Sequence, residues 1–111
     1  DDMREAPALT LIENVLAAGG SVAAHDPEAM HEARRRLGDR ITFAADAYGA
    51  CTGADALVLM TEWNEYRSPD WPRVRAALRA PVLVDMRNLY DPARMRAHGF
   101  RYDCVGRPAA D

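Results

Sequence analysis

The chain has 111 residues, of which 49% are hydrophobic and 28% charged, values that are typical of one soluble globular domain with a single core. Its net charge of −3 argues against general nucleic-acid binding, which requires a basic face. No apolar run approaches the roughly 20 residues of a membrane span, and two cysteines are too few for a disulfide framework. We therefore expect a cytoplasmic protein that binds neither membranes nor nucleic acid.

The first half of the chain alternates between predicted helices and strands. The expected elements are a helix over 5–18, a strand over 22–25, a helix over 27–38, a strand over 41–43 and a helix or turn over 46–51. In the first helix an apolar stripe at helical spacing begins at Leu9, and Pro7 is placed in the first turn, where a missing N–H costs nothing. Asp26 predicts an N-cap for the second helix, on whose polar face Glu32 and Arg36 lie four residues apart.

The second half continues the alternation with longer apolar strands. The expected elements are strands over 56–60, 82–84 and 101–105 and helices that open at Ser68 and Asp91. The apolar runs 56–60 and 81–84 are bounded by polar and turn residues, as in strands buried on both faces of a sheet. This order predicts the α/β class, as a Rossmann-like three-layer αβα domain with a parallel sheet.

The element order also predicts that one strand is missing. A helix comes first, although Rossmann-like units begin with a strand that lies at the centre of the sheet. We therefore expect the first, central strand to be absent, which leaves a gap and unpaired edges between the strands at 22–25 and 56–60. Because the chain opens on polar residues without an initiator methionine, we expect residues 1–111 to form one domain of a longer protein.

Polar side chains follow two of the apolar strands at the point where each strand ends. Thr61 and Glu62 come after the strand at 56–60, and Asp85, Arg87 and Asn88 come at the end of the strand at 82–84. In an open parallel sheet, ligands bind outside the carboxyl ends of the strands. These residues are therefore candidates for binding a nucleotide-like ligand. Asp85 and Arg87 are either a polar ligand clamp or a structural salt bridge, and the residues alone leave both readings open.

A few other residues have both a structural and a functional interpretation. Arg4 lies in the acidic segment before the first helix, where it either accompanies N-terminal capping or reaches a phosphate. Asp26 either caps the second helix or holds a ribose, and Cys51 and Cys104 are expected to be buried structural thiols. The residues show no nucleophile–base pair, metal-ligand cluster or phosphate-binding glycine loop, so no catalytic or metal-binding residue is predicted.

Several short motifs, taken in order and spacing, resemble one known family. They are Asp1–Pro7, His25–Pro27, Gly53–Val58, Thr61–Tyr66, Asp85–Pro92, Gly99-Phe100 and Val105–Arg107. Together they cover essentially the whole chain, which resembles the C-terminal UDP-binding domain of the UDP-glucose/GDP-mannose dehydrogenase family. Within that family, the enzymes that oxidise UDP-glucose are the most similar in these motifs.

The resemblance implies a role within a three-part, homodimeric enzyme. An N-terminal Rossmann domain binds NAD, a central helical region forms the dimer, and the present domain binds the UDP part of UDP-glucose during its oxidation to UDP-glucuronate. The family's catalytic cysteine motif is not in this chain, so neither Cys51 nor Cys104 inherits that role and we expect the chain alone to be inactive. Arg4 matches an arginine that approaches the NAD phosphates. Arg87 matches the arginine of the family's Asp-x-Arg-Asn motif and is expected near the substrate or cofactor. With the strand-end candidates Asp85, Asn88, Thr61 and Glu62 it makes up the predicted substrate-binding set.

Two other readings of the sequence are kept. A dehydrogenase of the same family could act instead on UDP-N-acetylmannosamine or GDP-mannose. A stand-alone receiver or regulatory nucleotide-binding module belongs to a different class, and it requires a phospho-accepting aspartate after the third expected strand. Asp46 is the residue at that place, but the acidic pair and the lysine that accompany such an aspartate are missing.

Overall fold

The computed structural model describes residues 2–61, 66 and 68–104, with side chains from residue 7 onward, and divides into the units Asp1–Ala50 and Cys51–Asp111. The elements in chain order are α1 (Asp2–Ala17), β1 (Ala23–Ala24), α2 (Met30–Leu37), the 3₁₀ turn η1 (Gly38–Arg40), β2 (Thr42–Phe43), α3 (Ala47–Cys51), β3 (Leu57–Leu59), α4 (Trp71–Ala77), β4 (Val82–Asp85), α5 (Pro92–Ala97) and β5 (Arg101–Cys104). This confirms the predicted alternation and the α/β class.

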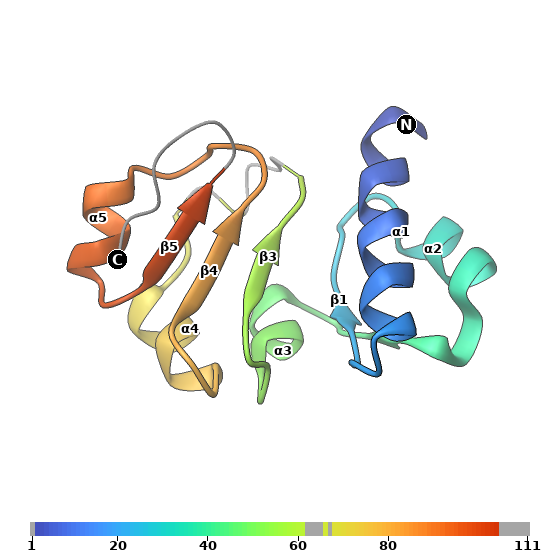
Figure 1. Ribbon diagram of the computed structural model, residues 1–111, viewed down its shortest axis with the longest axis horizontal. Coiled ribbons are helices and arrows are strands. Elements are labelled where there is room, and N and C mark those ends of the chain that lie inside the picture. The colour runs from blue at the N-terminus through green and yellow to red at the C-terminus, as the bar shows by residue number, and fades with distance from the viewer. Residues whose placement is uncertain (1, 62–65, 67, 105–111) are drawn as a thin grey trace. The chain divides into compact units, whose positions relative to one another are not determined.

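The described strands form two separate parallel sheets. One pairs β1 with β2, and the other has the order β3–β4–β5 (Figure 1). The first sheet belongs to the unit Asp1–Ala50 and the second to the unit Cys51–Asp111. None of the helices in the described part of the chain has the length and apolar character needed to cross a membrane.

In the first unit, α1 begins earlier than the sequence predicts. It starts at Asp2 rather than at residue 5, so Pro7 lies inside the helix and not in its first turn. The position assigned to Pro7 was therefore wrong: proline removes one backbone N–H from a helix, and here the helix continues through that loss. The predicted apolar positions, beginning with Leu9, are half-buried.

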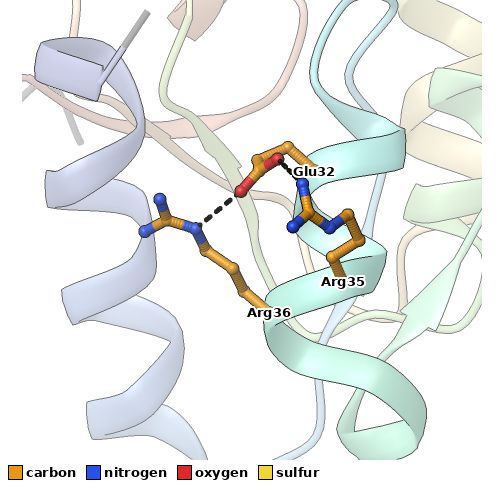
Figure 2. A network of polar contacts seen from close by, with 3 residues as sticks. All are labelled: Glu32, Arg35 and Arg36. Atoms are coloured by element: carbon orange, nitrogen blue, oxygen red, sulfur yellow. Dashed lines mark hydrogen bonds and ion pairs between the residues drawn. The ribbon is translucent and has the colours of Figure 1, made fainter.

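The second helix shows capping and side-chain pairing close to the prediction. The Asp26 Oδ1 atom accepts the backbone N–H groups of Glu28 and Ala29 at 2.8 and 2.9 Å, although regular helix begins only at Met30. Figure 2 shows Glu32 between Arg35 and Arg36, with N–O distances of 3.0 and 3.1 Å. Because these side chains are exposed, the pairs add little stability.

The second unit is built on the parallel sheet β3–β4–β5. Leu83 lies opposite Leu57 on one side and Tyr102 on the other, and the exposed fractions of Leu83 and Tyr102 are 0% and 1%. Right-handed crossovers that step in one direction place α4 and α5 on the same face of the sheet. Figure 1 shows the three strands side by side, with α4 passing behind them. On that face Trp71 makes edge-to-face contacts with Tyr90 and Phe100, at centroid distances of 4.9 and 5.4 Å.

Two details of this unit differ from the prediction. The side chains of β3 are not buried on both faces, because Val58 is 36% exposed. A continuous apolar run indicates a strand, but it does not say which neighbouring elements cover each face. In addition, α4 begins at Trp71 and not at Ser68, because the Asp70 carboxylate accepts the N–H of Arg73 at 3.1 Å and acts as the N-cap.

Candidate functional site

The carboxyl ends of β3 and β4 lie next to each other. The two strands are parallel with Leu59 opposite Asp85, and the backbone N–H of Met86 donates to the carbonyl of Leu59 at 2.9 Å. Thr61 follows β3 by two residues, and residues 86–88 follow β4 directly. The structure therefore confirms that the two polar segments begin at one edge of the sheet. We call this edge the rim, meaning Thr61 and residues 86–88.

Asp85 is the buried centre of the loop that follows β4. Its exposed fraction is 0%, and its Oδ1 atom accepts the backbone N–H of Arg87 at 2.9 Å. Its Oδ2 atom accepts the N–H groups of Leu89 and Tyr90 at 2.8 and 2.9 Å and the hydroxyl of Tyr102 at 2.6 Å. Three backbone donors of one loop thus converge on a single carboxylate, which holds the loop in one conformation.

This geometry changes the interpretation of Asp85. The two alternatives were a ligand clamp and a side-chain salt bridge with Arg87, but the bond between them in this structure comes from the backbone N–H of Arg87. With no exposed surface and both oxygens engaged, the Asp85 carboxylate does not reach a ligand in this conformation. Asp85 instead positions the backbone of the rim.

The loop that Asp85 holds presents Arg87 and Asn88 to solvent. Both side chains are exposed, as is Met86 at 41%. Asn88 has a backbone φ of 54°, in the left-handed region that asparagine tolerates better than most residues other than glycine. The loop therefore turns sharply at Asn88, directly after the exposed Arg87.

Three tyrosines extend the network around Asp85. The Tyr102 hydroxyl, on β5, donates to Asp85 and also lies 3.1 Å from the carbonyl oxygen of Tyr90. The Tyr90 hydroxyl in turn donates to the backbone carbonyl of Tyr66, and Tyr66 and Tyr90 are each 8% exposed. Sequence reasoning missed these roles. The sequence held one signal for Tyr102: a tyrosine at a buried position of a strand needs a hydrogen-bond partner for its hydroxyl.

The buried setting changes the ionisation of two groups in this unit. Burial raises the pKa of Tyr90 well above its usual range, and the negative charge of Asp85 raises it further, as does Cys51. Burial also raises the pKa of the Cys51 thiol. Burial therefore favours the neutral form of both groups, so Tyr90 can act as a hydrogen-bond donor and the nucleophilic thiolate form of Cys51 is disfavoured.

Comparison with known proteins identifies the family of the chain. Residues 1–92 match the family model described as the UDP binding domain of the UDP-glucose/GDP-mannose dehydrogenase family. The chain belongs to this family. Among its relatives, the UDP-glucose 6-dehydrogenase of Pseudomonas aeruginosa is 49% identical over 115 residues, covering 99% of this chain and 25% of that protein. That of Rhizobium meliloti is 44% identical over 108 residues, covering 97% of this chain and 24% of that protein.

A solved structure supports the fold of this family member. The crystal structure of NDP-N-acetyl-D-galactosaminuronic acid dehydrogenase from Methanosarcina mazei Go1 aligns with a TM-score of 0.74. The alignment covers 91% of this chain and 20% of that structure, at 24% sequence identity, a level at which the likeness speaks for the Rossmann-like fold alone. The chain thus spans about a quarter of the length of the relatives it matches.

The remaining candidates from the sequence are the two cysteines, Arg4 and Glu62. Cys51 and Cys104 are both free and buried, as predicted for structural thiols. In the part of the chain that the structure describes, no group of three His, Cys, Asp or Glu residues is arranged to hold a metal ion. Arg4 belongs to the first turns of α1, but its side chain lies outside the described residues, and so does the whole of Glu62.

Proposed function

We propose that this chain is the UDP-binding domain of an NAD-dependent UDP-glucose 6-dehydrogenase, which oxidises UDP-glucose to UDP-glucuronate. The observation that carries the proposal is the similarity to UDP-glucose 6-dehydrogenases along almost the whole chain, at 49% and 44% identity. The N-terminal and central domains would come from the same polypeptide, and the full protein would be a cytoplasmic homodimer.

The rim would bind the diphosphate and the sugar end of UDP-glucose. Arg87 is exposed at the carboxyl end of β4, where its planar guanidinium can donate two parallel hydrogen bonds to phosphate oxygens. Charge-assisted bonds of this kind contribute about 1.5–3 kcal/mol each. Asn88 and Thr61 supply an amide and a hydroxyl at the same edge, and Glu62 belongs to the proposed substrate-binding set with them.

Asp85 has a different role in the proposed site. Because its carboxylate is enclosed by the N–H groups of the loop, it would act on the substrate only through the position that it gives Arg87 and Asn88. It is therefore a positioning residue, and its replacement would disturb binding through the loop backbone.

The cofactor would meet this domain at Arg4. An arginine side chain has the charge and the fork geometry that suit a pyrophosphate, which is the chemistry that the NAD phosphates require. When bound, NAD supplies the hydride acceptor. This chain would contribute charge neutralisation and orientation, which bring the sugar carbon to the reacting groups on the other domains.

Turnover and binding measurements test the proposal. The full-length protein that contains this chain should reduce NAD with UDP-glucose and react far more slowly with UDP-N-acetylmannosamine or GDP-mannose. Arg87→Ala should weaken UDP-glucose binding by about 1.5–3 kcal/mol. Arg101→Ala is the matched control, because Arg101 is an exposed arginine at the amino end of β5 on the same sheet. Equal UDP-glucose affinity in the two variants would remove Arg87 from the site, and a preference for another nucleotide sugar would refute the proposed substrate.

A further inference from the structure

The loop after β4 is attached to the sheet at Met86 and to the Asp85 carboxylate beyond it. The backbone N–H of Met86 donates to the carbonyl of Leu59, as an extension of the β3–β4 ladder. Farther along, the Asp85 carboxylate accepts three backbone N–H groups of residues 87–90. The position of the backbone at Arg87 therefore depends on how the Asp85 side chain is oriented.

Tyr102 binds that carboxylate from a different strand. Its hydroxyl donates to the Oδ2 atom of Asp85 at 2.6 Å, a distance typical of a charge-assisted O–H···O⁻ bond. Tyr102 pairs with Leu83 in the β4–β5 ladder, and Asp85 follows Leu83 by two residues, so the side chains of Tyr102 and Asp85 lie on the same face of the sheet. Among the described residues, Tyr102 is the one partner of the carboxylate that lies outside the loop.

We propose that Tyr102 is a positioning residue for the nucleotide-sugar site, because its hydroxyl fixes the orientation of the Asp85 carboxylate and, through it, the backbone at Arg87. The proposal rests on the proposed function, since it takes Arg87 to bind the substrate. The three N–H groups belong to the loop and can move with the carboxylate, whereas Tyr102 is part of β5 and is 1% exposed. Its hydroxyl therefore favours one side-chain rotamer of Asp85, and its burial means that it acts on the substrate only through the loop.

Without the Tyr102 hydroxyl, the loop should adopt other arrangements before a ligand binds. The affinity for a ligand falls in proportion to the fraction of molecules that hold the binding arrangement. If Tyr102→Phe lowers that fraction to about 10–30%, the dissociation constant for UDP and the KM for UDP-glucose each rise about 3- to 10-fold. The turnover number at saturating UDP-glucose and the KM for NAD should stay within about twofold of wild type, because the arrangement with substrate bound is unchanged.

A double-variant experiment in the full-length protein asks whether Tyr102 acts through Arg87. Tyr102→Phe should raise the UDP dissociation constant when Arg87 is present. In the Arg87→Ala background the same change should alter that constant by less than about twofold, because the side chain that the loop positions is then missing. A general loosening of the core would instead weaken UDP binding equally in both backgrounds.

Hydrogen exchange followed by mass spectrometry reports on the loop without any ligand. In the full-length protein with Tyr102→Phe, the three amide hydrogens that the Asp85 carboxylate binds should exchange faster, because their acceptor is held less firmly. Val74→Ala is the control: it shortens a side chain of α4 that is 3% exposed, so it destabilises the same core and leaves the Tyr102 hydroxyl in place. It should bind UDP like wild type, and thermal melting checks that both variants are folded.

Isothermal titration with UDP, steady-state kinetics and hydrogen exchange together decide whether Tyr102 has this role. A UDP dissociation constant that rises with Tyr102→Phe, but not in the Arg87→Ala background, supports the inference. An unchanged constant, unchanged exchange of the loop, or an equal rise in Val74→Ala overturns it. If the wild-type protein binds no UDP, the proposed function is wrong and the inference falls with it, whereas equal binding by wild type and Tyr102→Phe refutes the inference alone.

Discussion

Replacing Asp85 by asparagine tests whether one carboxylate organises the rim. The amide keeps one oxygen, and the best use of that oxygen is in place of Oδ2, where Leu89, Tyr90 and Tyr102 donate. The amide NH₂ then faces the backbone N–H of Arg87, so one hydrogen bond is lost and two donors oppose each other.

The magnitude follows from these four contacts. An unsatisfied, partly buried N–H costs about 1–3 kcal/mol, and the three surviving bonds weaken because their acceptor is no longer charged. Part of this loss is offset because asparagine avoids the cost of burying a charge at a position with 0% exposure. We therefore expect Asp85→Asn to lower the free energy of unfolding by about 2–4 kcal/mol.

Urea unfolding of the 111-residue chain, followed by circular dichroism, measures this loss. Asp55→Asn is the matched control, because Asp55 is 79% exposed and its ion pair with Arg79, at 3.5 Å, is worth little. The control should stay within about 0.5 kcal/mol of wild type. If Asp85→Asn unfolds at the same urea concentration as the control, the carboxylate does not organise the loop and the reasoning is wrong.

Three further predictions rest on the buried groups and on the proposed cofactor contact. Because the pKa of Tyr90 is raised in the folded chain, the unfolded chain loses its proton first, so the contribution of Tyr90 to stability should be full below pH 10 and fall above it, by up to about 1.4 kcal/mol per pH unit. Denaturant titrations between pH 8 and 11 should show a shallower fall in Tyr90→Phe, and an unchanged slope contradicts the assigned cause. Cys51 and Cys104 should react with a thiol reagent only on the timescale of unfolding, and fast labelling of the folded chain argues against their burial. Arg4→Ala in the full-length protein should weaken NAD binding by about 1.5–3 kcal/mol in a fluorescence titration, and unchanged affinity removes that contact.

Local sequence predicted most of the secondary structure because its signals act over a few residues. Asp26, Asp70 and Asp91 each accept backbone N–H groups within three residues, and Gly38 ends α2 with a positive φ of 56°. The errors concern helix starts: the sequence predicts that a helix opens at Ser68, whereas Asp70, also a good N-cap, caps α4. The residue at which α4 starts depends on the tertiary packing of the buried Trp71 side chain, which local sequence does not show.

The candidate site was predicted only in outline. The rule that ligands bind at the carboxyl ends of parallel strands placed Thr61 and Arg87 at one edge, and the pairing of β3 with β4 confirms that these ends are neighbours. The same reasoning could not distinguish Asp85 from Arg87, because both are charged residues in one short motif. Their difference is one of burial, which depends on β5 and on the loop closing over the strand end.

The sequence by itself determined the class of fold, the family and the edge of the sheet that carries the polar residues, because periodicity, capping and motif spacing are local properties. The tertiary structure decided which of those residues are exposed and which are buried. It turned Asp85 inward, left Arg87 outside, and brought Tyr66, Tyr90 and Tyr102 into one network from three separate parts of the chain. The physical reason is that a buried carboxylate or phenol needs partners, and only the folded chain supplies partners that lie far apart in sequence.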